Sequence, residues 1–146
     1  MNRIVMRTLM AAAVVLGFTA VSRAEDSYTE GPVVDMTFVK VKPGHFEEYI
    51  KFIDTEWKAL NEALKKEGLI TAYRVVGAPS YGHEDWDLML VVEYKNMAAL
   101  DGLDDKSKPI VEKLAGSNQK MEEGTASRGE IREIIGEKMG RELILK

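Results

Sequence analysis

The 146-residue chain contains no cysteine, which excludes a disulfide scaffold and any chemistry that needs a thiolate. Basic residues are outnumbered, since 20 Lys and Arg against 24 Asp and Glu leave a net charge of -4. A nucleic-acid-binding surface needs a basic patch, so nucleic acid is not expected as a partner. With 45% hydrophobic and 30% charged residues, the composition is that of one globular domain.

Few residues of the types used in catalysis are present. The two histidines, His45 and His83, do not stand at the spacing of a metal-binding motif, so no metal and no cofactor are expected. The sequence also lacks a phosphate-binding loop, a nucleophile elbow and a glycine-rich dinucleotide turn. Kinase, hydrolase and dehydrogenase functions are therefore without support.

Residues 1–24 have the layout of a secretory signal peptide. Arg3 and Arg7 precede an uncharged run over 9–21, and Ser22 and Ala24 supply small residues at positions -3 and -1. The run has 13 residues, whereas a membrane-spanning helix needs roughly 20, so no permanent membrane anchor is expected. We expect cleavage after Ala24 and export to the periplasm or outside the cell, with a charge of -7 on the mature chain.

The remaining chain is predicted to form a single domain over 33–146, preceded by a flexible lead-in over 25–32 that ends in Gly-Pro. Alternating or β-branched apolar residues predict strands over 33–42, 69–76 and 86–94. Apolar residues that recur every three or four positions predict an amphipathic helix over 45–66. Its predicted buried stripe is Phe46, Ile50, Ile53, Trp57, Leu60 and Leu64.

The second half is less regular because Gly102 and Pro109 interrupt it. We expect a short turn from Met97, a main helix from Lys106 or Pro109 to Met121, a loop over 124–129, a short helical segment over 130–135 and a final strand over 137–145. The element order β-α-β-β-α-β predicts an α+β, ferredoxin-like fold, in which a four-stranded antiparallel sheet has its helices on one face.

The other face of that sheet would be bare. The residues predicted to face the helices are Val34, Met36, Phe38, Leu88, Leu90, Val92, Leu143 and Leu145. The bare face would carry Val39, Val41, Met89, Val91 and Ile144 among the polar Asp35, Thr37, Asp87, Glu93 and Glu142. Apolar patches of this kind mark partner surfaces, and a homodimer covers two copies with one self-complementary patch.

The run over 33–44, the aromatic-rich helix that follows and the run over 86–94, which leads to Met97-Ala98-Ala99-Leu100, resemble the dimeric α/β-barrel superfamily. The similarity is one of pattern over residues 33–145, without a catalytic motif of one branch. It implies a homodimer, and it is strongest to small exported members of unknown role, so it transfers no reaction. The superfamily also includes haem-dependent enzymes, but neither histidine stands in a recognisable haem context.

Three functions stay open. The first is an exported homodimer that binds a small aromatic or apolar molecule in its barrel cavity. The second is a cofactor-independent monooxygenase or isomerase that acts on a small aromatic substrate, as in other branches of the superfamily. The third is a structural dimer without a ligand.

The candidate site residues are those predicted to lie between the sheet and its partner, with polar residues of the loop before residue 86. Asp35, Asp87 and His83 are the candidate catalytic groups, because buried carboxylates are costly unless paired and a histidine beside acids can carry a proton. Arg74 and Arg141 are the candidate partners of these acids. The candidate ligand-binding residues are Thr37, Tyr73, Arg74, Trp86, Met89 and His45. The alternative interpretation is a salt-bridged dimer interface with a polar hairpin loop.

Overall fold

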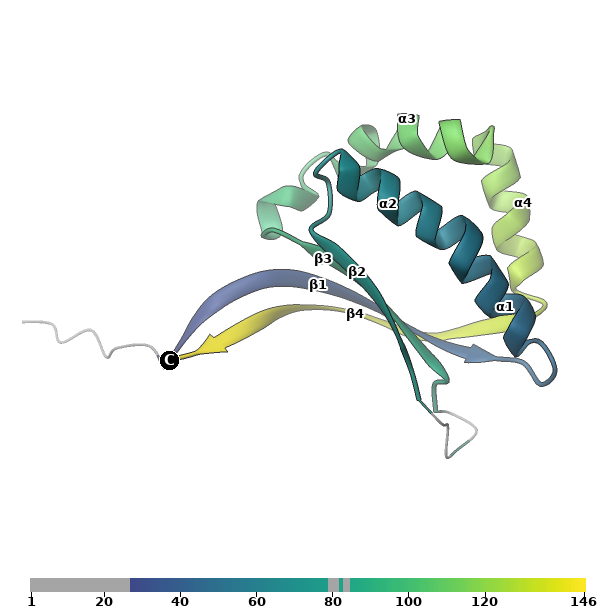
Figure 1. The fold of residues 1–146 in the computed structure, drawn as a ribbon, viewed down its shortest axis with the longest axis horizontal. Helices are drawn as coiled ribbons and strands as arrows, with labels where there is room; N and C mark the ends of the chain where they lie inside the picture. The colour runs from purple at the N-terminus through teal and green to yellow at the C-terminus, as the bar shows by residue number, and fades with distance from the viewer. Residues whose placement is uncertain (1–26, 79–81, 83–84) are drawn as a thin grey trace, which may run out of the picture.

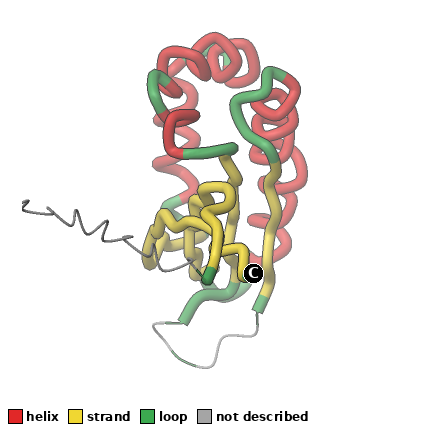
Figure 2. The backbone as a smooth tube through the Cα atoms, turned by 90° about the vertical axis from the view of Figure 1, so that its left-hand side faces the viewer, coloured by secondary structure: helices red, strands yellow, loops and turns green. Residues whose placement is uncertain are grey.

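The computed structural model describes residues 27–78, 82 and 85–146, which form two layers. One layer is a four-stranded antiparallel sheet with the order β2-β3-β1-β4, and the helices lie on one side of it (Figure 1; Figure 2). The strands are β1 (Tyr28–Val41), β2 (Ala72–Gly77), β3 (Leu88–Tyr94) and β4 (Arg132–Leu145). The predicted α+β class and ferredoxin-like arrangement are confirmed.

The helical layer contains one long helix between β1 and β2 and several shorter elements between β3 and β4. They are α1 (Phe46–Phe52), the π-helical turn η1 (Ile53–Trp57), α2 (Lys58–Lys66), the 3-10 turn η2 (Met97–Leu100), α3 (Leu103–Ala115) and α4 (Asn118–Arg128). α1, η1 and α2 form one continuous helix, and α3 crosses above α2 before α4 returns toward the sheet (Figure 1).

The predicted first helix is present, and most of its predicted stripe faces the core. Ile53 is buried, and Ile50, Trp57 and Leu64 pack against buried core residues. Phe46, which was expected in the stripe, is 46% exposed, whereas Tyr49 is buried. Asn61 is also buried, and its Nδ2 donates to the Trp57 carbonyl at 2.8 Å.

β1 has the predicted strand period but the opposite phase. Val33 and Val39 pair with Tyr94 and Leu88, and all four side chains are buried beneath the helices. The helix-facing residues of β1 are therefore Val33, Asp35, Thr37, Val39 and Val41, and those on the open face are Val34, Met36 and Phe38. The prediction that Asp35 and Thr37 face a partner is wrong. Both sets contain apolar residues, so alternation identified the strand and left its orientation undetermined.

β3 has the predicted orientation. Leu88 and Leu90 are buried on the helix side, while Met89, Val91 and Glu93 lie on the open face, opposite Phe38, Met36 and Val34 of β1. Two hydrophobic clusters result beneath the helices, one around Val39, Tyr49 and Leu88 and the other around Val33, Ile70 and Tyr94. The sheet therefore contributes buried residues to the helix layer, and the open face has no helix over it.

The second half of the chain is more helical than predicted. α3 begins at Leu103, earlier than expected, and contains Pro109; it ends before Gly116, whose φ of 80° favours glycine. The expected loop over 124–129 falls mostly within α4, and β4 begins at Arg132 in place of the short helix expected over 130–135. Gly124 has a low helix propensity, which is why the segment from residue 124 was predicted as a loop. At the start of β4, pairing with β1 outweighs the helical propensity of the sequence.

β1 and β4 continue beyond the other strands as a two-stranded ribbon (Figure 1). Tyr28 pairs with Leu145 and Glu30 with Leu143, so most of the segment predicted as a flexible lead-in belongs to β1. Leu143 and Leu145 were expected beneath the helices, but the ribbon carries them past the helical layer and Leu145 is 79% exposed.

Candidate functional site

The three candidate catalytic residues are not brought together. Asp35 lies on the helix-facing side of β1, and Asp87 precedes β3 near the other end of the sheet. His83 falls outside the described residues. The expected cluster of two acids and a histidine is therefore not assembled among the residues that the structure describes.

Asp35 is a half-buried carboxyl group on the helix-facing side of the sheet. Burial, and next the negative charge of Glu137 on β4, raise the pKa of Asp35, while a hydrogen bond from the Met36 backbone N–H lowers it. Burial and the charge of Asp35 also raise the pKa of Tyr94. Asp35 thus retains its proton to a higher pH than an exposed aspartate does.

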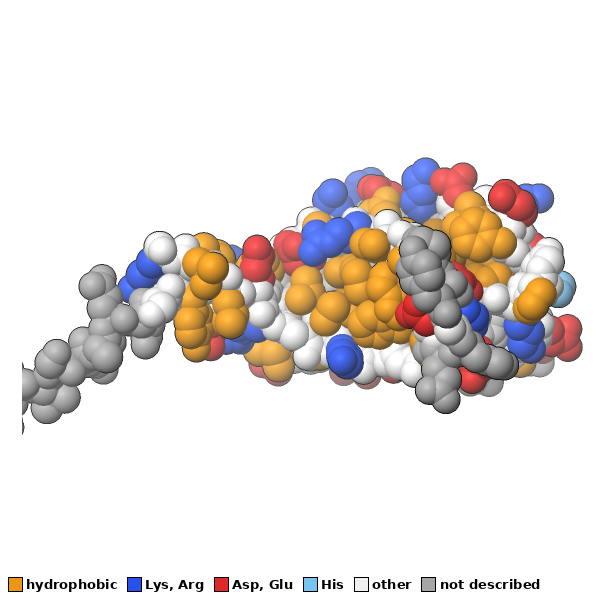
Figure 3. Space-filling view, turned by 90° about the horizontal axis from the view of Figure 1, so that it is seen from below, with side chains coloured by type: hydrophobic (Ala, Val, Ile, Leu, Met, Phe, Trp, Pro, Cys, Tyr) orange, Lys and Arg blue, Asp and Glu red, His pale blue; other side chains and the backbone are white. Residues whose placement is uncertain are grey.

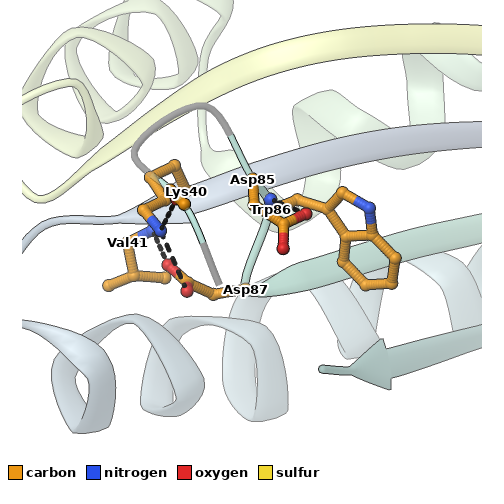
Figure 4. Close-up of polar contacts among 6 residues, drawn as sticks. Lys40, Val41, Asp85, Trp86 and Asp87 are labelled. Carbon is orange, nitrogen blue, oxygen red and sulfur yellow. Dashed lines mark hydrogen bonds and ion pairs between the residues drawn. The ribbon is translucent and has the colours of Figure 1, made fainter. Parts of the chain in front are cut away.

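Asp87 holds two strands together (Figure 4). Its carboxylate accepts a hydrogen bond of 2.8 Å from the Val41 backbone N–H and forms an ion pair of 3.5 Å with Lys40. The backbone N–H of Asp87 donates to the Val39 carbonyl at 2.9 Å. The neighbouring Asp85 accepts from the Trp86 backbone N–H at 2.9 Å. These contacts give Asp87 a structural role at the end of β1.

Several candidate ligand-binding residues do lie on one surface. Arg74 of β2 and Met89 of β3 point to the open face, where Arg74 pairs with Glu93 at 3.6 Å. Trp86 packs edge to face on Phe38, with ring centroids 5.7 Å apart. Arg74 and Arg141 were the candidate partners for acids on this face; Arg74 pairs with Glu93 of β3, whereas Arg141 pairs with Glu30 of the ribbon.

The other candidates are placed elsewhere. Tyr73 faces the helices, packs on Trp57 at 5.4 Å and donates a hydrogen bond to Glu62. His45 precedes α1, where its Nδ1 contacts the Glu48 carboxylate at 2.8 Å. Thr37 lies on the helix-facing side of β1 beside Leu90. These three residues stabilise the helix layer and do not line the surface shared by Arg74, Trp86 and Met89.

The open face carries a continuous apolar patch. We use the name open-face patch for Val34, Met36 and Phe38 of β1, Met89 and Val91 of β3, and Val76 of β2. Figure 3 views the molecule from this side and shows hydrophobic side chains gathered over the centre of the sheet. Gly136 and Gly140 of β4 lie beside the patch, so Phe38 and Met36 extend over bare backbone there.

A second feature is a cavity of about 580 Å³ between the helices, which we call the interhelical pocket. Its size is within the usual range for small-molecule sites. Three helices line it with one stripe each, together with Trp57. The stripes are Phe52, Thr55, Glu56, Ala59 and Leu60 from the first helix, Val111, Leu114 and Ala115 from α3, and Lys120, Gly124 and Arg128 from α4.

Two arginines stand at the α4 end of this pocket. The Arg128 guanidinium lies 4.4 Å from the centre of the Phe52 ring, and Arg132 lies 5.7 Å from that of Tyr49. Burial, and next the positive charge of Arg132, lower the pKa of Arg128, while Glu56 and Tyr49 raise it. The Nε atoms of Arg128 and Arg132 are buried without a hydrogen-bond partner among the described residues.

The sequence reasoning missed the interhelical pocket. A signal existed, because Lys120, Gly124 and Arg128 are spaced four residues apart, which puts them on one face of a helix. The segment was interpreted as part helix and part loop, so this spacing was not used.

Within the described part of the chain, no three residues of the types His, Asp and Glu are grouped so that they could hold a metal ion. No described helix combines the length and the apolar character needed to cross a bilayer.

No protein-family model matches this sequence, and no curated protein matches it. Among solved structures, the chain is similar to the crystal structure of HapK from Hahella chejuensis, with a TM-score of 0.51 and 10% sequence identity. The match covers 75% of this chain and 91% of that chain. At this identity the similarity concerns the fold alone, which is a small ferredoxin-like α+β fold.

Proposed function

We propose that this protein is an exported homodimer that binds a small aromatic or apolar molecule between two sheets joined through their open faces. The open-face patch is the observation that carries the proposal, because it lies on the side of the sheet that carries no described helix. Val91 of the patch is already buried within one chain, whereas Val76 is 37% exposed. Apolar patches of this kind mark interaction surfaces. Export rests on the sequence of residues 1–24, which lie outside the described residues.

A second copy of the chain suits this surface better than a charged partner. Two of the charges at its edge are paired within the chain, Arg74 with Glu93 and Lys40 with Asp87, while Lys138 lies opposite Met36 on the same face. The two ion pairs reduce the repulsion between like charges when two copies approach, and a two-fold axis makes one patch cover the other. Gly136 and Gly140 let the side chains of Phe38 and Met36 lie against the backbone of β4, which extends the apolar surface toward that strand.

A flat ligand fits the aromatic end of the same surface. Phe38 and Trp86 already pack edge to face there, and Met89 lies opposite Phe38 with a polarisable side chain. Aromatic ligands gain from offset or edge contacts with such rings. This supports phenols, quinols and similar small aromatics as the ligand class.

The homodimer is tested by light scattering on the purified protein at micromolar concentration. We expect twice the mass of one chain, and we expect Phe38→Glu to give the single-chain mass because it places a charge in the centre of the patch. Phe46→Glu is the matched control, since Phe46 is exposed at the start of α1, on the helix layer. A single-chain mass for the unmodified protein contradicts the proposal.

Ligand binding is tested with 1-naphthol and naphthohydroquinone. Both should raise the melting temperature of the unmodified protein but not that of Phe38→Glu. If neither compound changes the melting temperature, a structural dimer without a ligand is favoured.

A cofactor-independent oxygenase or isomerase is the second candidate, and the raised pKa of Asp35 is the observation that favours it. A carboxyl group that retains its proton to a higher pH than an exposed aspartate does is better suited to general acid–base work. Asp35 lies on the helix-facing side of β1, so the substrate of this candidate would bind there and not at the open-face patch. Consumption of the same phenols, lost in Asp35→Asn but kept in Phe38→Glu, would establish this candidate. Binding without consumption leaves the protein as a binder.

A further inference from the structure

The interhelical pocket lies in the helix layer, away from the open face, and is complete within one chain. Its walls are mostly apolar, since Phe52, Trp57, Leu60, Val111 and Leu114 contribute most of the large side chains. These residues come from the first helix and α3. An apolar body of a small molecule therefore fits between them.

The polar end of the pocket is built around Arg128. Gly124 lies one turn earlier on α4, and a Cβ atom there would stand 3.1 Å from Nη1 of Arg128. The glycine thus leaves the space that the guanidinium occupies as it lies over the Phe52 ring. Nη2 donates to the Thr125 hydroxyl at 2.9 Å, which fixes the group from one side.

Arg128 is one of the residues that line the pocket, so its guanidinium can supply a donor to a ligand there. Its Nε is buried beneath protein atoms, so the donors available to a ligand are the two Nη groups, of which Nη2 also donates to Thr125. The two Nη groups of an Arg fork can bind one carboxylate through parallel N–H bonds. A cationic head group is disfavoured at the same place.

The local charge also favours an anion. Among the described lining residues, Glu56 is acidic, whereas Lys120 and Arg128 are both basic, and Arg132 lies near Tyr49. This excess of positive charge contrasts with the net charge of -4 for the whole chain. A singly charged anion can neutralise this positive charge, and removing it from water costs less free energy than removing a dianion such as a phosphate monoester.

We propose that the interhelical pocket binds a small amphipathic monocarboxylate, whose carboxylate pairs with Arg128 and whose apolar body lies along Trp57, Leu60 and Leu114. The ligand class covers medium-chain fatty acids and arylalkanoic acids, which share one carboxylate on an apolar body. The site is formed within one chain, so it does not depend on the homodimer or on a ligand at the open face.

The test compares decanoate with decan-1-ol, and 4-phenylbutyrate with 4-phenylbutanol, by isothermal titration calorimetry on the purified protein. A charge-assisted hydrogen-bonded pair corresponds to a preference of about tenfold or more for each carboxylate over its alcohol. The aliphatic and aromatic pairs show which body the pocket prefers. Trp57 lies in the lining, so binding should also change the tryptophan fluorescence, and Trp57→Phe should remove that change.

Four variants locate the site. Arg128→Gln should abolish the preference for the carboxylate, and Arg128→Lys should retain part of it because the charge remains without the fork. Ala59→Trp should block both members of each pair, since Ala59 is an exposed lining residue and the larger side chain fills the pocket. Arg141→Gln is the control, because Arg141 pairs with Glu30 on the ribbon.

Three outcomes overturn the proposal. Equal affinity for carboxylate and alcohol excludes the role of Arg128, and binding that persists in Ala59→Trp excludes the pocket. If Arg141→Gln loses the preference for carboxylate over alcohol as fully as Arg128→Gln does, the preference comes from the overall charge of the protein and not from Arg128. If Arg128→Gln unfolds, as judged by circular dichroism, Arg128→Lys and Ala59→Trp still decide the question.

Discussion

At the scale of single residues, Asp35 and Asp87 show that the same side chain type has opposite consequences in two surroundings. Asp87 accepts a backbone N–H and an ion pair, which compensate the cost of removing its carboxylate from water. Asp35 is half-buried next to Glu137, and burial and this like charge raise its pKa. Ionised Asp35 therefore opposes folding, whereas ionised Asp87 supports it.

Asp35→Asn is expected to stabilise the protein at pH 7. The raised pKa means that the folded state binds the Asp35 proton more tightly than the unfolded chain, whose pKa is near 3.8. Stability from this group is present below that value and is lost as the pH rises through the higher folded value. The gain at pH 7 should be about 0.5 kcal/mol, a small figure because solvent screens a half-buried group, and it should vanish near pH 3.5. Urea unfolding of both proteins at the two pH values measures it.

Asp87→Asn supplies the control for this experiment. It should lower the stability at pH 7 by about 1 kcal/mol, because it weakens the bonds to Val41 and Lys40. If Asp35→Asn instead destabilises the protein at pH 7, Asp35 has a favourable partner and its ionised form supports the fold.

At the scale of elements, the sequence predicts the helices and strands better than it predicts which side they present. The strand around Val33 and Val39 was identified from its alternation, but valine occurs on both sides of β1, so its phase depends on pairing with β3. The predicted stripe of the first helix includes Phe46, which is exposed at the start of α1, and lacks Tyr49, which is buried. Both errors concern tertiary packing, which a local period does not contain.

The candidate site was predictable to the same extent. Arg74 was a candidate partner for acids on the open face, and it pairs there with Glu93. Arg128 was not selected, because its role depends on α4 being a helix and on three helices meeting. A site formed between elements is invisible to a search for motifs along the chain.

α3 and α4 should be the least protected helices in amide hydrogen exchange. α3 has no buried residue and contains Pro109, which lacks the N–H of a helical bond, and α4 contains Gly124 in its interior. α1 and α2, by contrast, bury Tyr49 and Asn61. Exchange measured by mass spectrometry should therefore be faster over 103–115 and 118–128 than over 46–66.

Arg128→Gln sharpens this expectation. The Arg128 guanidinium over the Phe52 ring connects α4 to α1, so its removal should speed exchange in 118–128 and leave the strands unchanged. Protection of α4 equal to that of α1 and α2 would show that packing of α4 is tighter than its exposure indicates.

At the scale of the whole molecule, the layer order determines where each ligand class can bind. Helices cover one face of the sheet, so the open-face patch is left for a second copy and its aromatic end for an uncharged ligand. The interhelical pocket is on the other side and is basic, so it selects anions. The two proposed sites differ in polarity and position, and variants at Phe38 and Arg128 test them separately.

The stability of the whole molecule should depend on protein concentration. If two chains share the open-face patch, association stabilises the folded state by mass action, so the melting temperature should rise as the concentration increases. A hundredfold increase corresponds to about 2.7 kcal/mol of dimer free energy. Scanning calorimetry from micromolar to hundreds of micromolar protein measures the change in melting temperature.

The melting temperature of Phe38→Glu should be the same at every protein concentration, whereas that of Phe46→Glu should still rise with concentration. A melting temperature of the unmodified protein that is constant over this range would mean that the open face stays uncovered or that the dimer does not contribute to stability, and either result contradicts the homodimer as the folded unit.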